Sequence, residues 1–310
     1  MDTHELLGKI TRLPIVADGM AENMLAGNFR SVFKGQGMEF DEARHYQWGD
    51  DARSIDWNAS ARLGTPFVKI FREERELTIL LLLDTSASMH GEIFQPDGHK
   101  TQIPNPFEQA LITAALIAFS AERSGQRVGA FLFDREIDRV FPPRKGRRNV
   151  LAFVSGALQC HKPKTAIRRT AAAHTEYTSN LRSAIAGAGR LLKRRSMVVL
   201  ISDFYSAGWE HELGGLSSRH DVIAIRISGP LDGNLPDLGL ISLNDSETGL
   251  QIAAPTGSAS FRDAWFQWHK DRADLWQNLC RRAGAAHLEV SVDTDPAAVL
   301  TRFFGGRGGR

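Results

Sequence analysis

The chain has 310 residues, 42% of them hydrophobic and 24% charged, which suits one large globular domain or two modest ones. Its 38 Lys and Arg residues nearly balance 36 Asp and Glu residues, so the net charge of +2 excludes a whole-chain attraction to nucleic acid or to an anionic membrane. The two cysteines lack metal or redox spacing, which argues against a disulfide framework and favours a reducing compartment. Because no apolar stretch reaches the ~20 residues that cross a bilayer, and no signal-peptide core opens the chain, we expect a cytoplasmic protein without a membrane span.

The first part of the chain has few regular patterns. Apolar residues at helical spacing predict a short helix at 5–13, which ends before Pro14. Residues 33–71 are rich in Gly, aromatic side chains and both signs of charge, and only 66–71 alternate like a strand. We therefore predict that residues 1–75 form a separate N-terminal segment, irregular and partly β, that packs on the rest of the chain.

Strand and helix patterns alternate through the remainder. Strands are predicted at 79–83, 128–133, 197–201, 221–227 and 286–290, and helices at 107–123, 149–158, 181–192, 209–216, 261–282 and 296–304. A hairpin of 238–243 with 249–253 interrupts this order. Such alternation produces βαβ crossovers, so we predict an α/β domain over 76–304 with a doubly wound, mainly parallel sheet. Residues 305–310 are predicted to be a disordered tail.

The strand at 79–83 contains no polar residue and runs directly into Asp84, Ser86 and Ser88. A strand of this kind is buried on both faces, as in parallel sheets covered by helices. Ligand sites in such sheets lie beyond the carboxyl ends of the strands, which is where Asp84 stands. One carboxylate and two hydroxyls supply oxygen ligands for Mg²⁺. The alternative is that Asp84 and the serines cap a helix or form a turn.

Two further segments favour the metal site over the cap. The apolar strand at 197–201 delivers Asp203 to the same edge of the sheet, and hydroxyls of Thr178 and Ser179 precede the helix at 181–192. Two carboxylates balance the charge of Mg²⁺, or of Mn²⁺ as the alternative ion, but leave its coordination incomplete. We therefore expect an acidic group of a partner to complete the site.

The sequences around the two aspartates, LDTSASM from Leu83 and VVLISDF from Val198, resemble the first and third loops of a von Willebrand factor A domain. Such domains carry a metal-ion-dependent adhesion site. The resemblance implies that the ion is surrounded by Asp84, Ser86, Ser88, Ser179 and Asp203, with Thr178 as the alternative to Ser179. The family usually has a Gly-Thr pair in the second loop, where this chain has Thr-Ser.

The upstream sequence resembles a second pattern. The stretches GQGMEFDEARHY from Gly35, GDDARSIDW from Gly49 and AR from Ala61 are similar to the box that defines a bacterial family called domain of unknown function 58. The likeness extends over nearly the whole chain, with Trp48 in place of a common Pro. Members of that family are often encoded with MoxR-type AAA+ ATPases. The resemblance therefore implies a partnership with such an ATPase in assembling or maturing a client protein complex.

This box mixes both signs of charge with aromatic side chains, and two interpretations remain open. The favoured one is structural, because bidentate pairs between arginines and carboxylates can lock an irregular segment. The other is a docking surface, since Trp, Tyr and Arg are common interface hot spots. The docking candidates are Arg44, Tyr46, Asp50, Asp51, Arg53, Asp56 and Trp57.

We predict a non-enzymatic interaction module whose metal is completed by an Asp or Glu of a partner. One alternative is a Mg²⁺-dependent phosphohydrolase with Asp84 as nucleophile. Haloacid-dehalogenase-like enzymes need a second Asp two residues later, and here that position is Ser86. Another alternative is nucleic-acid binding through basic clusters at 144–148, 168–169 and 193–195, which solvated loops and helix-end charges explain more simply.

Overall fold

The computed structural model describes residues 39–48, 50–51, 54–72, 77–90, 105–160, 180–229, 231–233, 235–244 and 251–307, together with Gly8 and Leu13. The chain divides into two compact units, one of them Arg30–Glu76 and the other containing Leu77–Arg310. The helix predicted at 5–13 lies outside the described residues except for Gly8 and Leu13.

The smaller unit contains two antiparallel strands, β1 (Glu39–His45) and β2 (Phe67–Arg72), and the short helix α2 (Trp57–Leu63). The strand predicted at 66–71 is confirmed. β1 was not predicted, because the register shift between Phe40 and Glu42 breaks the alternation that would have revealed it.

Local capping explains the limits of α2. The side chain of Asp56 accepts hydrogen bonds from the N–H groups of Asn58 and Ala59, which have no partner inside the first turn. The helix ends at Gly64, whose φ of 73° is the left-handed conformation that favours glycine.

The larger unit is built on a six-stranded sheet with the order β10-β7-β6-β3-β4-β5. All neighbours pair in parallel except β5, which is antiparallel to β4. The bounds are β3 (Thr78–Asp84), β4 (Arg127–Phe133), β5 (Ile137–Arg144), β6 (Met197–Ser202), β7 (Asp221–Ser228) and β10 (Ala286–Ser291). The five parallel strands lie within a residue or two of their predicted ranges, so a mainly parallel α/β sheet is confirmed.

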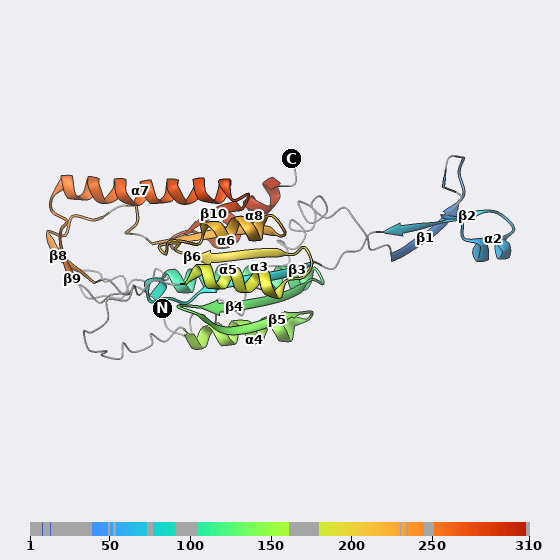
Figure 1. Ribbon diagram of the computed structural model, residues 1–310, viewed down its shortest axis with the longest axis horizontal. Helices are drawn as coiled ribbons and strands as arrows, with labels where there is room; N and C mark the ends of the chain where they lie inside the picture. Colours follow the sequence, from blue (N-terminus) through green and yellow to red (C-terminus); the bar gives the residue numbers. More distant parts are fainter. Residues whose placement is uncertain are drawn as a thin grey trace. The chain divides into compact units, whose positions relative to one another are not determined.

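Helices cover both faces of this sheet (Figure 1). One layer contains α3 (Pro106–Arg123), α4 (Arg147–Cys160) and α8 (Pro296–Arg307), and the other contains α5 (Leu181–Leu191), α6 (Glu210–Ser217) and α7 (Ala259–Arg282). The apolar residues of β3 and β6 are fully buried between the two layers. None of the helices in the described part of the chain is long and apolar enough to span a membrane.

One further prediction is confirmed, and two features differ from the predictions. The hairpin of β8 (Leu240–Asn244) and β9 (Gln251–Pro255) is confirmed. β5 was missed, because it is an edge strand with many exposed side chains and the sequence IDRVFPPR, whose prolines are tolerated only at an edge. α8 continues to Arg307, so it includes the first residues of the predicted disordered tail.

Candidate metal centre

The two aspartates that follow apolar strands lie at the same edge of the sheet. β3 and β6 are parallel neighbours, with Leu83 opposite Ile201 in the last register pair. Asp84 therefore stands at the carboxyl end of one strand, and Asp203 directly follows the other. Asp84 is fully buried and Asp203 is 6% exposed, so both carboxyl groups are removed from bulk water.

Both carboxyl oxygens of Asp84 accept hydrogen bonds. The backbone N–H of Ser86 donates to Oδ1 at 2.9 Å, and the hydroxyl of Ser202 donates to Oδ2 at 2.6 Å. Ser202 is the last residue of β6, so this second bond ties the ends of the two strands together. The clue to this role of Ser202 in the sequence is a hydroxyl at the end of an otherwise apolar strand.

The serine hydroxyls link the two aspartates. The hydroxyl oxygens of Ser86 and Ser88 are 3.0 Å apart, and a hydrogen bond joins the Ser88 side chain to the Asp203 carboxyl group. The structure therefore brings together four of the residues expected at the metal site, which are Asp84, Ser86, Ser88 and Asp203.

Burial dominates the electrostatics of this cluster. Burial first, and repulsion from Asp203 second, raise the pKa of Asp84 to about 7, although hydrogen bonds from Ser202 and Ser86 oppose the shift. Burial also raises the pKa of Asp203, against the effect of the Ser88 hydrogen bond. The two carboxylates thus lie close together in a place that disfavours their negative charge.

The second loop of the expected site falls mostly outside the described residues, which resume at Asn180, so nothing is described of Thr178 and Ser179. The next residue, Asn180, caps α5 by accepting a hydrogen bond from the N–H of Ser183, and its own N–H donates to the carbonyl of Asp134 after β4. The start of α5 is thereby held next to the carboxyl end of β4.

The chemistry of the donor set fits a hard cation. Carboxylate and hydroxyl oxygens are the ligands that Mg²⁺ accepts, and this ion commonly keeps several waters. Among the described residues there is no group of three or more His, Cys, Asp or Glu side chains that could hold a metal. A site here would therefore depend on hydroxyls and water as well as on the two carboxylates, which suits Mg²⁺ better than a transition metal.

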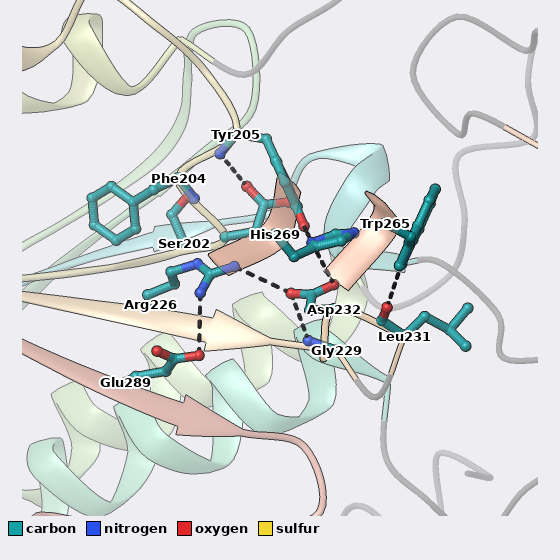
Figure 2. A network of polar contacts seen from close by, with 11 residues as sticks. Ser202, Phe204, Tyr205, Arg226, Gly229, Leu231, Asp232, Trp265, His269 and Glu289 are labelled. Atoms are coloured by element: carbon teal, nitrogen blue, oxygen red, sulfur yellow. Dashed lines mark hydrogen bonds and ion pairs between the residues drawn. The ribbon is translucent and has the colours of Figure 1, made fainter. Parts of the chain in front are cut away.

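A second polar network, which the sequence did not reveal, lies beside this site (Figure 2). The guanidinium of Arg226 is 3.1 Å from Glu289 and 3.4 Å from Asp232, and its side chain is only 5% exposed. Asp232 also accepts a hydrogen bond from the N–H of Gly229 and lies 3.8 Å from Nδ1 of His269. Burial raises the pKa of Asp232 even though Arg226 opposes the shift.

A pocket of about 420 Å³ opens onto this network. It lies between α7 and the ends of β7 and β10, and β7 is the neighbour of β6, so the pocket lies beside the loop that carries Asp203. Its lining includes Arg226, Ser228, Asp232, His269, Lys270 and Glu289. The carboxyl edge of the sheet therefore combines the candidate metal centre with an adjacent concave surface.

The docking candidates of the smaller unit have mixed environments. Arg44 forms a bidentate ion pair with Asp50 at 2.7 and 2.8 Å, and Asp50 also accepts the N–H of Gln47. With Asp56 capping α2, both Asp50 and Asp56 have structural roles. Trp57 is 72% exposed.

Two further candidates lie within the described residues. Asp51 is exposed and Tyr46 is half-buried. Arg53 lies outside the described residues. The structural interpretation of this segment thus has direct support from its hydrogen bonds, and the docking interpretation retains only its exposed side chains.

The fold and the site define an α/β protein with buried acidic residues at the carboxyl edge of a mainly parallel sheet. The family described as "Protein of unknown function DUF58" matches residues 42–274, so the chain belongs to that family, as predicted. "Uncharacterized protein Rv1480" of Mycobacterium tuberculosis is 30% identical over 308 residues, covering 99% of this chain and 91% of the relative. "Uncharacterized protein MAV169" of Mycobacterium avium is 37% identical over 126 residues, covering 40% of this chain and 73% of that protein.

Solved structures resemble the chain more distantly. An aerotolerance-related membrane protein from Bacteroides fragilis superposes with a TM-score of 0.41 at 17% identity, covering 74% of this chain and 98% of that chain. The PilB minor pilin from Streptococcus sanguinis gives a TM-score of 0.38 at 10% identity, covering 78% of this chain and 63% of that chain. Membership of the family therefore rests on sequence.

Proposed function

We propose that this protein is a non-enzymatic, metal-dependent interaction module with the adhesion site of a von Willebrand factor A domain. The observation that carries the proposal is the pair of buried carboxyl groups, Asp84 and Asp203, joined through the hydroxyls of Ser86 and Ser88. A bound Mg²⁺ would offset the burial that opposes ionisation of both groups and the repulsion that Asp203 exerts on Asp84. Oxygen atoms of these four residues would hold the ion, and Ser179 or Thr178 would add one hydroxyl.

The same donor set supports an acidic partner. Two carboxylates neutralise a divalent cation, and hydroxyls and water occupy coordination positions that an incoming carboxylate can take. We propose that an Asp or Glu of a partner completes the coordination, next to the pocket between α7 and the ends of β7 and β10. From the resemblance described above, the partner is a MoxR-type AAA+ ATPase acting with this chain on a client protein complex.

Metal binding is tested by titrating the full chain with Mg²⁺ in a calorimeter. Asp84→Asn removes a ligand charge and should weaken binding at least tenfold. Asp221→Asn is the matched control, because Asp221 begins β7 at the opposite edge of the same sheet and should leave binding unchanged. Equal Mg²⁺ affinity in wild type and Asp84→Asn would contradict the proposal.

Partner binding is tested by capture of a MoxR-type ATPase on the immobilised chain, with Mg²⁺ or with EDTA. Capture should require Mg²⁺ and should be lost in Ser86→Ala, whose substitution removes one hydroxyl without a change of charge. Capture that is insensitive to both EDTA and Ser86→Ala would contradict metal-dependent docking. Release of phosphate from p-nitrophenyl phosphate, abolished in Asp84→Asn, would instead support the phosphohydrolase.

A further inference from the structure

The turn that carries Asp203 has a strained backbone. Phe204 has a φ of 57° and is the one non-glycine residue with positive φ in the described part of the chain. A residue with a bulky side chain adopts this conformation only when its surroundings hold it there, and such residues gather at functional sites.

The strained conformation has a clear effect on its neighbours. This conformation lets the N–H of Phe204 donate to the hydroxyl oxygen of Ser202 at 3.0 Å, and the N–H of Tyr205 donate to Oδ1 of Asp203 at 3.0 Å. Ser202 in turn donates to Asp84. The turn therefore orients both the Asp203 carboxyl group and the hydroxyl that binds Asp84.

Two sets of contacts hold the turn in place. The ring of Phe204 is 6% exposed and packs on Trp209 and Trp276, with centroid distances of 5.4 and 5.5 Å. This packing anchors the side chain of the strained residue. This packing does not hold the next residue, Tyr205, whose N–H donates to Asp203. Other contacts fix Tyr205.

α7 supplies those contacts to Tyr205. The guanidinium of Arg272 donates to the carbonyl of Tyr205 at 3.1 Å, and its central carbon lies 4.7 Å from the centroid of the Tyr205 ring. The same guanidinium lies 5.0 Å from the ring centroid of Trp268. The Tyr205 hydroxyl is 3.3 Å from Nδ1 of His269, a ring that is neutral at pH 7 because burial lowers its pKa to about 4.

We propose that Arg272 is a positioning residue for the metal centre, an inference that rests on the proposed function. By holding the carbonyl and the ring face of Tyr205, it fixes the N–H that orients the Asp203 carboxyl group. Arginine suits this position, because its planar guanidinium donates hydrogen bonds in its plane while its face covers an aromatic ring. The ammonium group of lysine has no planar face, so lysine could donate to the carbonyl of Tyr205 but would cover its ring less well.

The test uses the full chain, with Mg²⁺ alone as the probe. Arg272→Met should weaken Mg²⁺ binding at least tenfold in the calorimeter, and Arg272→Lys should weaken it by less. Arg282→Met is the control, because Arg282 is an exposed arginine of the same helix, and its Mg²⁺ affinity should equal that of wild type. The far-ultraviolet circular dichroism of Arg272→Met should match that of wild type, which separates positioning from unfolding. If Arg272→Met does not fold, Arg272→Lys carries the test.

A metal-free measurement separates this inference from the proposed function. In EDTA, the ¹³C carboxyl resonance of Asp203 should shift in Arg272→Met and stay in place in Arg282→Met. Wild-type Mg²⁺ affinity in both Arg272 variants would overturn the inference and leave the proposed function standing. If wild type binds no Mg²⁺, the proposed function fails, and an unmoved Asp203 resonance would then overturn the positioning role as well.

Discussion

The two units of the chain each contain an arginine–aspartate pair, and burial gives the two pairs opposite characters. In the smaller unit, Arg44 and Asp50 meet at 2.7 Å with side chains that are 38% and 18% exposed. In the larger unit, Arg226 and Asp232 meet at 3.4 Å with side chains that are 5% and 19% exposed, so the burial of the arginine is what differs between the pairs. The Arg44 hydrogen bond lowers the pKa of Asp50, whereas burial raises the pKa of Asp232 although Arg226 opposes it.

Burial determines which of the carboxyl groups are unfavourable in their charged form. An ion pair near water needs little explanation, and the Arg44–Asp50 pair serves to fasten a short irregular segment. Buried carboxyl groups with raised pKa values gather at functional sites. Asp84, Asp203 and Asp232 all have raised pKa values and all lie at or beside the carboxyl edge of the sheet. The carboxyl edge of the sheet is therefore distinguished by carboxyl groups whose charge is disfavoured, in contrast to Asp50 of the smaller unit, whose charge is favoured.

The largest expected effect is a difference in the free energy of unfolding between variants that lack Arg226 and variants that lack Arg44. Arg226→Met leaves Asp232, whose side chain is 19% exposed, without its guanidinium partner, so it should lower the free energy of unfolding by about 3 kcal/mol. Arg44→Met breaks a pair that water screens and should change stability little. Urea unfolding of both variants measures the difference. Equal losses in the two variants would contradict the distinction between a buried and an exposed pair.

The same contrast explains which parts of the molecule the sequence could predict. The apolar runs of β3 and β6 identify buried parallel strands, and their ends place Asp84 and Asp203 at one edge without any knowledge of tertiary contacts. The Arg226 network was missed, because its partner Glu289 is its register neighbour on β10, and pairing between strands 63 residues apart leaves no local pattern. An arginine in the strand sequence DVIAIRIS was the available clue.

The backbone conformation of Phe204 was the second feature that could not be predicted from the sequence. Nothing in the sequence around Phe204 indicates a positive φ, because this conformation is imposed by the packing of Trp209, Trp276 and α7 around the turn. Among the aromatic residues of α7, Trp276 is buried in the core, but Trp268 is 49% exposed. The periodicity of apolar residues indicates a buried strand, but it does not indicate the tertiary contacts that hold a loop.

The next effect concerns the carboxylates of the candidate metal centre, Asp84 and Asp203, and their response to a cation. Mg²⁺ at 100 times its dissociation constant should stabilise the wild-type chain by about 2.7 kcal/mol. Asp203→Asn removes one ligand charge and should abolish this stabilisation, while Asp50→Asn in the smaller unit should retain it. Urea unfolding with Mg²⁺ and with EDTA gives both numbers. Stabilisation by Mg²⁺ that survives in Asp203→Asn would show that the ion binds elsewhere.

The pH dependence of the metal-free protein should follow the buried carboxyl groups. Unfolded Asp84 ionises near pH 3.9, whereas the folded protein holds its proton until about pH 7. Between these values the folded state binds more protons, so the free energy of unfolding in EDTA should fall as the pH rises from about 4 to about 7. Asp84→Asn should flatten this decline. A metal-free stability that rises steadily over the same interval would contradict the raised pKa.

The smallest expected effect is on the pKa values of Asp50 and Asp232, which compare the two ion pairs directly. Carboxyl ¹³C titration should give Asp50 a pKa below its ordinary 3.8 and Asp232 a pKa above that value. Asp50 therefore contributes stability at higher pH that is lost as the pH falls through its folded pKa, and Asp232 imposes a cost that grows as the pH rises through its own. Arg44→Met should return Asp50 to its ordinary pKa, whereas Arg226→Met, where it remains folded, should raise Asp232 further. If the Asp232 pKa instead fell below 3.8 in wild type, attraction to Arg226 would outweigh burial, and the larger unit would keep its ion pair for the same reason as the smaller one.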